Sequence, residues 1–399
     1  MPSVSARAAA ISLPPFDVLN ILAAERRSAG RNVITLGQGV PGFGPPPAAI
    51  DAARDALSRP ATHLYCADAG LLSLRDALAS RLRAHHGIDA AADDLIITAG
   101  GNQAFMLAAA TLLDHGDEVI LGAPYFVNHE MALRAVGAVP IEAGTSEAQG
   151  FRTRWRDIEP HITPRTRAVV LCTPSNPTGA VIDAAELARI IRELGTRRIM
   201  LMCDETYMHF VYDGPQPAHG GILTSPSAAA SIGWRDHVVV LGTFSKSFGM
   251  TGWRLGYLLA SPEICAHAIK IQDAMIICAP VISQIAAEAA VRDSWTYAYD
   301  YHDELRARRQ VLVEELASIP GLHWTPTAGG FFAFVRVAGC TDSAALSRDI
   351  LDTVDVVTIP GATFGRSGEG YLRLSYGAAG QDTLREACGR LRRFFAGQR

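Results

Sequence analysis

"GTFSKSFGMTGWRLGY", residues 242–257, connects two apolar segments and contains one of the two lysines of this chain. It follows "HVVVLG" (237–242) and continues into "GYLLA" (256–260), and we expect both segments to be buried strands. Taking the two lysines from the 36 basic residues leaves 34 arginines, so codon usage explains why lysine is scarce but not why it remains here. Arginine stays protonated, whereas a lysine in a suitable pocket loses its proton and attacks a carbonyl. Lys246 is therefore a candidate nucleophile.

Apolar strands alternate with helical segments over most of the chain. The other expected strands are "DLIIT" (94–98), "DEVILG" (117–122), "AVVLC" (168–172) and "IMLMCD" (199–204), and helices are expected over 102–116 and 183–195. Strands that are apolar throughout and are followed by helices predict an α/β fold with a mostly parallel sheet covered on both faces. Ligands of such sheets bind at the carboxyl ends of the strands.

The pattern changes after about residue 285. A long charged helical segment (298–319) is followed by "GGFFAFVRV" and "GYLRLSYG", which predicts a second, smaller α+β domain. We place the large domain at 47–285 and the small domain at 286–399, and we expect the N-terminal segment 1–46 to join the small domain.

Composition argues against several classes of protein. The 399 residues are 49% apolar with a net charge of −4, which leaves no basic surface for nucleic acid or for an anionic membrane. The seven cysteines are odd in number and lack C-x-x-C spacing, so we expect neither disulfides nor a metal site. Pro14 and Pro15 interrupt the N-terminal segment before a signal-peptide core could form, and the apolar run 104–113 is too short to span a bilayer. These features favour a cytoplasmic protein.

The segment "GQGVPG" (37–42) matches the glycine pattern of dinucleotide-binding enzymes, which gives a rival interpretation. In that fingerprint the third glycine lies on a helix that has already begun. Here Pro41 lies inside the motif, and "PGFGPPP" continues as a loop. We therefore do not expect a nicotinamide cofactor.

Polar residues follow several of the expected strands. Asp204 ends an apolar strand, where a buried carboxylate needs a cation unless it caps a helix. The small residues of "ITAGGNQ" (97–103) form either an ordinary tight turn or a site where free backbone N–H groups hold a phosphate. Ser245 and Arg254 flank Lys246 and could bind the same anion. Together these residues suit a ligand with an aldehyde, a cationic ring nitrogen and a phosphate.

A set of motifs in this chain resembles those of a known family. The motifs are "LGQGVPGF", "YCADAGLLSLRDAL", "TAGGNQA", "APYF", "TPSNPTG", "CDETY", "SKSFGMTGWRLGY" and "YLRLSYG". Their order resembles that of the class I and II aminotransferases of pyridoxal-phosphate (PLP) fold type I, the aspartate aminotransferase superfamily, from about residue 35 to 377. The resemblance implies pyridoxal 5′-phosphate as cofactor, a large domain with a mostly parallel sheet between helices, and a smaller α+β domain.

The resemblance also implies catalytic roles for individual residues. Lys246 would form the Schiff base with the cofactor and shuttle the substrate proton. Asp204, supported from behind by His129, would pair with the ring nitrogen, while Tyr207 and Asn176 would hydrogen-bond the phenolic oxygen.

Other residues of the motifs would hold the cofactor and the substrate. Phe126 would stack on the ring, and the phosphate would be bound by Gly101, Asn102, Ser245 and Arg254. Tyr65 matches a tyrosine that reaches the phosphate of the neighbouring subunit, so the resemblance implies a homodimer with shared active sites. Arg373 would clamp the substrate carboxylate with the help of Asn176 and the backbone of Gly39, and a cis bond is plausible before Pro177.

The activity implied by the resemblance is ping-pong transfer of an amino group from an L-amino acid to a 2-oxo acid. We identify no arginine for a second substrate carboxylate, and the surroundings that can be placed are Phe16, Tyr125, Phe331 and Phe332. A neutral, bulky donor is therefore expected, as in the branch of the family that acts on aromatic amino acids and methionine. Two alternatives stay open: elimination, cyclisation or oxidation on the same fold, and a ligand-sensing regulator, although about 35 residues before the first motif leave little room for a DNA-binding module.

Overall fold

A seven-stranded sheet forms the centre of the structure, a computed structural model that describes residues 4–213 and 223–397. Its strands are β2 (Leu95–Thr98), β3 (Glu118–Ala123), β4 (Val139–Gly144), β5 (Thr166–Cys172), β6 (Met200–Asp204), β7 (Val238–Thr243) and β8 (Gly256–Leu259). They lie in the order β2-β8-β7-β6-β5-β3-β4, and β8 is antiparallel to both of its neighbours while all other pairs are parallel. The predicted α/β fold with a mostly parallel sheet is confirmed.

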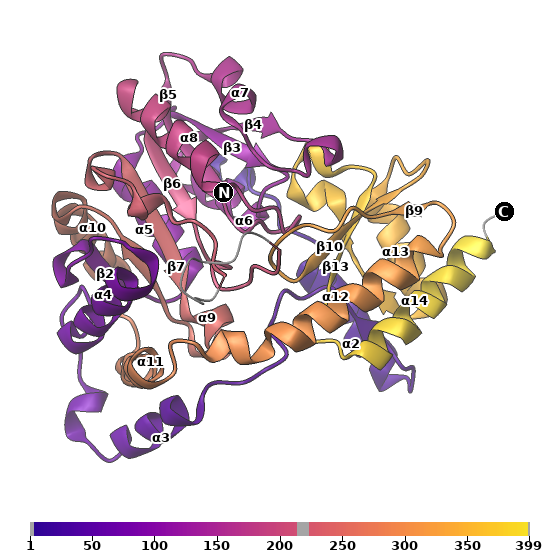
Figure 1. Ribbon diagram of the computed structural model, residues 1–399, viewed down its shortest axis with the longest axis horizontal. Coiled ribbons are helices and arrows are strands. Elements are labelled where there is room, and N and C mark those ends of the chain that lie inside the picture. The colour runs from indigo at the N-terminus through magenta and orange to yellow at the C-terminus, as the bar shows by residue number, and fades with distance from the viewer. Residues whose placement is uncertain (1–3, 214–222, 398–399) are drawn as a thin grey trace.

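Helices cover both faces of this sheet (Figure 1). One face packs against α4 (Leu72–His86), α8 (Ala184–Thr196) and α11 (Val281–Asp293), and α3 (Pro47–Ala56) rests on α11. The other face packs against α5 (Gly101–Leu112), α6 (Val127–Val136) and α10 (Pro262–Ile276). Within β6, Leu201 and Cys203 enter the first layer and Met202 enters the second. Both faces of every strand except the edge strand β4 are largely buried, which is why these strand segments are mostly apolar.

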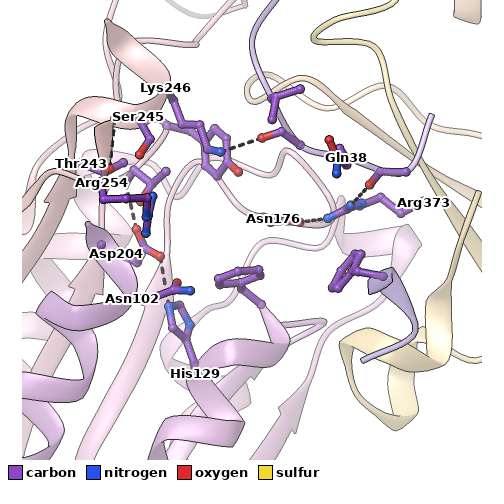
Figure 2. Close-up of a pocket in the computed structure, with 18 of the residues that line it drawn as sticks. Gln38, Asn102, His129, Asn176, Asp204, Thr243, Ser245, Lys246, Arg254 and Arg373 are labelled. Atoms are coloured by element: carbon purple, nitrogen blue, oxygen red, sulfur yellow. Dashed lines mark hydrogen bonds and ion pairs between the residues drawn. The ribbon is translucent and has the colours of Figure 1, made fainter. Parts of the chain in front are cut away.

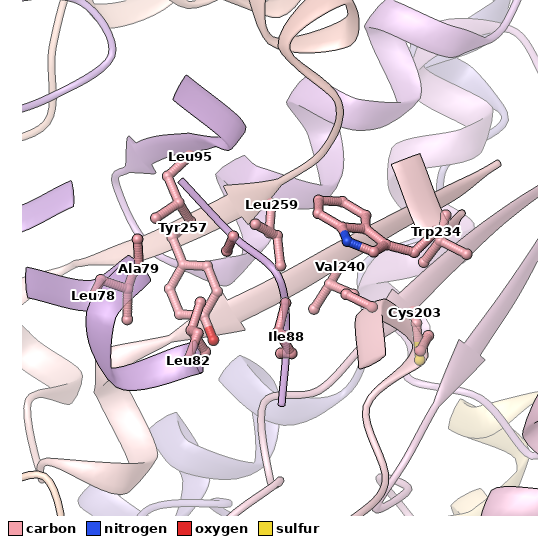
Figure 3. Close-up of a cluster of buried hydrophobic side chains, with 14 of the residues drawn as sticks. Leu78, Ala79, Leu82, Ile88, Leu95, Cys203, Trp234, Val240, Tyr257 and Leu259 are labelled. Carbon is pink, nitrogen blue, oxygen red and sulfur yellow. The ribbon is translucent and has the colours of Figure 1, made fainter. Parts of the chain in front are cut away.

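The hydrophobic core between the sheet and α4, α8 and α11 extends to Phe244 and Phe248, which flank Lys246. Figure 3 shows Tyr257 packed among Leu78, Leu82 and Leu259 beneath the sheet. A Cβ atom at Gly242 would lie 2.0 Å from the Tyr257 ring, so only glycine allows β7 to pass over this ring. The Tyr257 ring therefore packs directly against the backbone at the end of β7.

The C-terminal part of the chain forms a second sheet. Its strands run in the antiparallel order β12 (Ile359–Pro360), β13 (Tyr371–Ser375), β10 (Phe332–Val337) and β9 (Leu322–His323). The helices here are α12 (His302–Ala317), α13 (Ser343–Val354) and α14 (Gln381–Ala396). β1 (Ile34–Thr35) pairs in parallel with β11 (Val356–Val357), so the indigo N-terminal segment lies with the yellow C-terminal elements in Figure 1. The remaining helices are α1 (Ala6–Ala9), α2 (Phe16–Ser28), α7 (Trp155–Ile158) and α9 (Phe244–Ser247).

Some elements differ from those predicted by the sequence patterns. The patterns do not indicate β4, which lies at the sheet edge, contains Pro140 and is mostly half-buried or exposed. The expected helix over 102–116 ends at Leu112, because the Asp117 side chain accepts a hydrogen bond from the backbone of Asp114 and forms a turn there. The helix expected over 298–319 is divided into a 3-10 segment, Tyr297–Tyr301, and α12. Within the described residues, no helix has the length and hydropathy that crossing a membrane requires.

Candidate active site

A cavity of about 380 Å³ lies at the carboxyl ends of the central strands (Figure 2). β6 and β7 are neighbours in the middle of the sheet, and they deliver Asp204 and Lys246 to the wall of this cavity. The lining contains most of the site residues predicted from the sequence: Gly39, Gly101, Asn102, Phe126, His129, Asn176, Asp204, Tyr207, Ser245, Lys246, Arg254 and Arg373.

Lys246 lies on α9, a single helical turn that follows β7. The turn is capped by the Thr243 hydroxyl, which accepts a hydrogen bond from the Ser245 N–H at 3.1 Å. The Lys246 Nζ donates to the Gly39 carbonyl oxygen at 2.7 Å. Burial and, to a lesser extent, the charges of Arg373 and Arg254 lower the pKa of the Lys246 amine, Asp204 opposes them, and the resulting pKa is about 8. An appreciable fraction of the amine is therefore neutral near neutral pH and can act as a nucleophile or base.

Asp204 occupies the end of β6 with 8% of its surface exposed. Its Oδ1 accepts a hydrogen bond from the Thr206 N–H at 2.9 Å, and its Oδ2 lies 3.0 Å from His129 Nε2. Burial raises the pKa of the carboxyl, but the hydrogen bonds from His129 and Thr206 outweigh burial and hold the pKa below its usual value. The carboxylate is thus charged and faces the cavity, where it can hold a cation.

The start of α5 and Arg254 form a corner that suits an anion. α5 begins after Gly100, whose φ is +88°, and the N–H groups of its first turn have no partner within the helix. A Cβ atom at Gly100 would lie 2.4 Å from Arg254 Nη2, so only glycine allows the guanidinium to approach the helix start. Ser245 and Asn102 also line this cavity (Figure 2). A helix N-terminus, a guanidinium and a hydroxyl together can bind a phosphate.

Arg373 reaches the cavity from β13 of the second sheet and is 2% exposed. Its Nη1 donates to Asn176 Oδ1 at 2.8 Å and its Nη2 donates to the Gly37 carbonyl oxygen. Burial lowers the pKa of this guanidinium to about 10, so it stays charged at neutral pH. Its Nε is buried without a hydrogen-bond partner. Three rings lie 4.8 to 5.3 Å from the guanidinium carbon, those of Phe16, Phe332 and Phe364.

Tyr207 and Asn176 bring their polar groups to the same cavity. Tyr207 is 3% exposed, and burial raises the pKa of its hydroxyl. Asn176 follows β5, and its bond to Pro177 is cis. A Cβ atom at Gly39 would lie 2.9 Å from the Phe332 ring and 3.7 Å from the Tyr207 hydroxyl, so the Gly39 backbone packs directly on these side chains.

The glycine-rich segment 37–40 contacts two basic side chains of the cavity, Arg373 and Lys246. The Gly37 carbonyl accepts from Arg373, and the Gly39 carbonyl accepts from Lys246. The segment then continues as a loop until α3 begins at Pro47. The helix that a dinucleotide fingerprint requires inside the motif is therefore missing from this described segment.

The expected aromatic surroundings are only partly in contact with the cavity. Phe126, the N-cap residue of α6, lines the cavity and meets the His129 ring edge-on, with centroids 5.5 Å apart. Phe16 also lines it. Phe331 and Phe332 are buried outside the lining in contact with Tyr207, and the Tyr125 hydroxyl donates to Glu130 at 2.9 Å instead of facing the cavity.

Several residues of the lining are not among the predicted site residues: Asp17, Asn20, Gln38, Thr206 and Thr243. Phe16, Asp17 and Asn20 lie on one face of α2, while Leu19 and Ala23 are buried on another. This helical spacing is visible in the sequence and could have indicated a helix that turns a polar face toward a site.

Tyr65 is not part of this cavity. It is 77% exposed and follows Leu64, which is 67% exposed. Its predicted role therefore depends on a second subunit.

The cavity thus brings together a partly neutral amine, a carboxylate that can hold a cation, an anion-binding corner and a buried guanidinium. Such a set can hold a phosphorylated cationic ring and a carboxylate side by side. The amine can then react with, or take a proton from, a molecule held between them.

Comparison with known proteins points to one family. The model of the family described as "Aminotransferase class I and II" matches residues 31–391. Aromatic-amino-acid aminotransferase 2 of Thermococcus litoralis is 35% identical over 90% of both chains, and aspartate aminotransferase of Pyrococcus horikoshii is 34% identical over 94% of both. Among solved structures, a single mutant of Thermus thermophilus aspartate aminotransferase matches with a TM-score of 0.90 at 30% identity, covering 98% of this chain and 100% of that one.

Proposed function

Because this chain belongs to the class I and II aminotransferase family, and is thus a pyridoxal-phosphate-dependent enzyme that transfers amino groups, we propose that its amino donor is a neutral, bulky L-amino acid and its acceptor a 2-oxo acid. One observation carries this proposal. The lining of the described cavity contains one amine, Lys246, and two guanidinium groups, Arg254 and Arg373. Each of the three has a use in binding the cofactor or the α-carboxylate, so the described lining of one chain leaves none of these cations for a second carboxylate.

The residues of the cavity fit pyridoxal 5′-phosphate. The corner formed by Gly100, the first turn of α5 and Arg254 suits its phosphate, because a side chain at Gly100 would block it. The charged carboxylate of Asp204 suits its ring nitrogen, and the buried hydroxyl of Tyr207 suits its phenolic oxygen. Lys246 supplies the amine that binds its aldehyde.

When bound, this cofactor supplies an aldehyde that captures amines and a cationic ring that withdraws electrons from the carbon next to the captured nitrogen. We propose that Asp204 keeps a proton on the ring nitrogen, since its carboxylate is charged and held by His129. The Lys246 amine takes the proton from the substrate Cα, because its lowered pKa makes it a base near neutral pH, and it would deliver this proton to the carbon of the cofactor's former aldehyde group.

Arg373 is proposed to fix the substrate by its carboxylate. The guanidinium is held by Asn176 and Gly37, and its buried Nε retains an unused donor. A guanidinium fixed in this way can donate two parallel hydrogen bonds to a carboxylate. This holds the substrate carboxylate in one orientation and so places the substrate nitrogen and Cα relative to Lys246. Phe16 adjoins this guanidinium and gives the site an apolar wall for the donor side chain.

Steady-state kinetics with a panel of donors tests the proposed substrate class. Phe, Tyr, Met, Ala and Asp are compared as donors with 2-oxoglutarate as acceptor, and kcat/KM is measured for each. We expect Phe, Tyr and Met to exceed Asp, since Asp brings a second carboxylate beside Asp17. A clear preference for Asp would overturn the donor class without affecting the family assignment.

We further propose a homodimer in which Tyr65 completes the site of the partner subunit. Tyr65, Leu64 and Leu57 lie in the segment between α3 and α4, and their apolar side chains are 77%, 67% and 60% exposed. Light scattering tests the dimer, and a monomeric mass for the active enzyme contradicts it. Mixing Tyr65→Ala with Lys246→Ala subunits tests the sharing: hybrid dimers regain activity only if Tyr65 acts across the interface.

From its composition we also propose that the enzyme works in the cytoplasm, and from its family that it serves amino-acid metabolism and biosynthesis. Cell fractionation with an antibody to the protein tests the location. Recovery in a membrane or secreted fraction would contradict it.

A further inference from the structure

One hydrogen bond joins the two segments that present the proposed catalytic groups. Segment 204–210 follows β6 and presents Asp204 and Tyr207, while segment 243–248 follows β7 and contains Lys246. His209 Nδ1 lies 2.6 Å from the hydroxyl of Ser247. Of the described hydrogen bonds, it is the only one between side chains of these two segments. The bond therefore links the amine to the groups that would hold the ring.

Ser247 is well placed to control the orientation of Lys246. α9 spans only Phe244–Ser247, and a single turn is too short to be stable without tertiary contacts. Its first end is capped by Thr243, and its last residue is held by His209. Because Ser247 directly follows Lys246 and is buried, a hydrogen bond that fixes its hydroxyl also restrains the turn that carries the amine.

His209 is itself held from several sides. It is 3% exposed, and its carbonyl oxygen lies 2.6 Å from His302 Nε2. Its ring meets Trp295 at 5.3 Å, Tyr299 at 5.6 Å and His86 at 5.5 Å between centroids. Burial, followed by the charges of the neighbouring histidines, lowers its pKa well below the usual value. The ring is therefore neutral, and a neutral imidazole offers one donor and one acceptor.

The second ring nitrogen argues against a purely structural role for His209. Its Nε2 is buried without a hydrogen-bond partner, which costs stability. A cavity of about 10 Å³ adjoins the ring and is also lined by Glu205 and Ser247. Replacing both partners of a buried hydrogen bond by apolar groups of the same shape can be nearly neutral or stabilising. If the bond served the fold alone, an apolar pair at positions 209 and 247 would therefore do as well.

We propose that His209 is a positioning residue, which through its bond to Ser247 holds the turn bearing Lys246 in register with the segment bearing Asp204 and Tyr207. The inference rests on the proposed role of Lys246 as the amine that binds the cofactor. His209 touches neither cofactor nor substrate, since it does not line the large cavity. It acts behind the wall of the site.

The test compares His209→Leu, Ser247→Ala and the double variant with wild type, and it uses His86→Leu as the matched control. His86 packs on His209 but has no described bond to α9. Three quantities are measured: kcat and KM for the amino donor, the rate constant for covalent attachment of pyridoxal phosphate to apoprotein, and the unfolding temperature of the apoprotein.

We expect both single variants to lower kcat and the attachment rate by about 10- to 100-fold, the loss typical of a misplaced reacting group. KM changes little, because Arg373 is untouched, and His86→Leu behaves as wild type. The double variant is no worse than either single variant, because both remove the same bond. His209→Asn restores part of the rate, because its amide can still bond Ser247.

The opposite results overturn the inference. They are wild-type kcat and attachment rate in His209→Leu and Ser247→Ala with only the unfolding temperature changed, or losses that multiply in the double variant. If His209→Leu does not fold, the kcat and attachment rate of Ser247→Ala alone test the inference, because this variant removes only the hydroxyl oxygen. Failure of the proposed function is distinguishable, because wild-type apoprotein would then show no attachment at Lys246.

Discussion

Replacing Arg373 with lysine tests the proposed carboxylate clamp while keeping the positive charge. The guanidinium spans Asn176 and Gly37 and lies against the face of Phe332, 4.8 Å from the ring centroid. A lysine amine is a point charge that cannot reproduce this planar fork. Each hydrogen bond to a charged group contributes about 1.5–3 kcal/mol. Losing one bond of a bidentate pair is therefore expected to lower kcat/KM for amino acids by roughly 10- to 150-fold.

The assay compares an amino acid with the amine that lacks its carboxylate. Phenylalanine and 2-phenylethylamine are each mixed with holoenzyme, and the single-turnover bleaching of the visible cofactor band is followed. We expect Arg373→Lys to slow phenylalanine and to leave the amine unchanged, because the amine never uses the clamp. Arg336→Lys on the neighbouring strand β10 is the control, since its side chain is 52% exposed and pairs with Glu147. An equal loss for both substrates would show that Arg373 supports the fold and would refute the clamp.

Three further predictions concern the cofactor site. Asp204→Asn is expected to lower kcat on the order of 10²- to 10³-fold, as for other lost electrostatic partners, and a near-wild-type single-turnover rate counts against its role. Gly100→Ala is expected to weaken cofactor binding about tenfold in equilibrium dialysis, since the methyl group meets Arg254 at 2.4 Å and φ is +88°, while Gly252→Ala, with open space around it, should bind normally. In the apoprotein, the folded pKa of Lys246 is about 8 against 10.5 unfolded, so the unfolded state binds more protons between these values and stability rises with pH across that window. Lys246→Met should therefore raise the unfolding temperature more at pH 7 than at pH 10, and a difference that is constant with pH contradicts this.

The sequence predicts the sheet well because its strands are buried on both faces. The bounds of β6 and β7 lie within one residue of the expected segments, since their apolar runs end at polar residues, Asp204 and Thr243. The edge strand β4 escapes this reasoning, because one of its sides faces solvent and it includes Pro140. The proposed domain boundaries stay a prediction.

The site is partly predictable for a different reason. Asp204, Lys246 and Arg373 lie in motifs that resemble those of the family, and the structure places all three around one cavity. The bond between His209 and Ser247 could not be predicted, because it depends on how the segment that follows β6 packs against α9. The same applies to Asp17, which reaches the cavity only because β1 pairs with β11 and brings the N-terminal segment to the second sheet.

The most direct test of the proposed role of Lys246 is to find which amine of the protein binds the cofactor. Holoenzyme is reduced with borohydride and digested, and the pyridoxyl group is located by mass spectrometry. The chain offers an internal control, since its only other lysine, Lys270, is exposed beside His267. We expect the adduct on Lys246 and none on Lys270. An adduct on Lys270, or no adduct in an enzyme that still transaminates, would contradict the proposed role of Lys246.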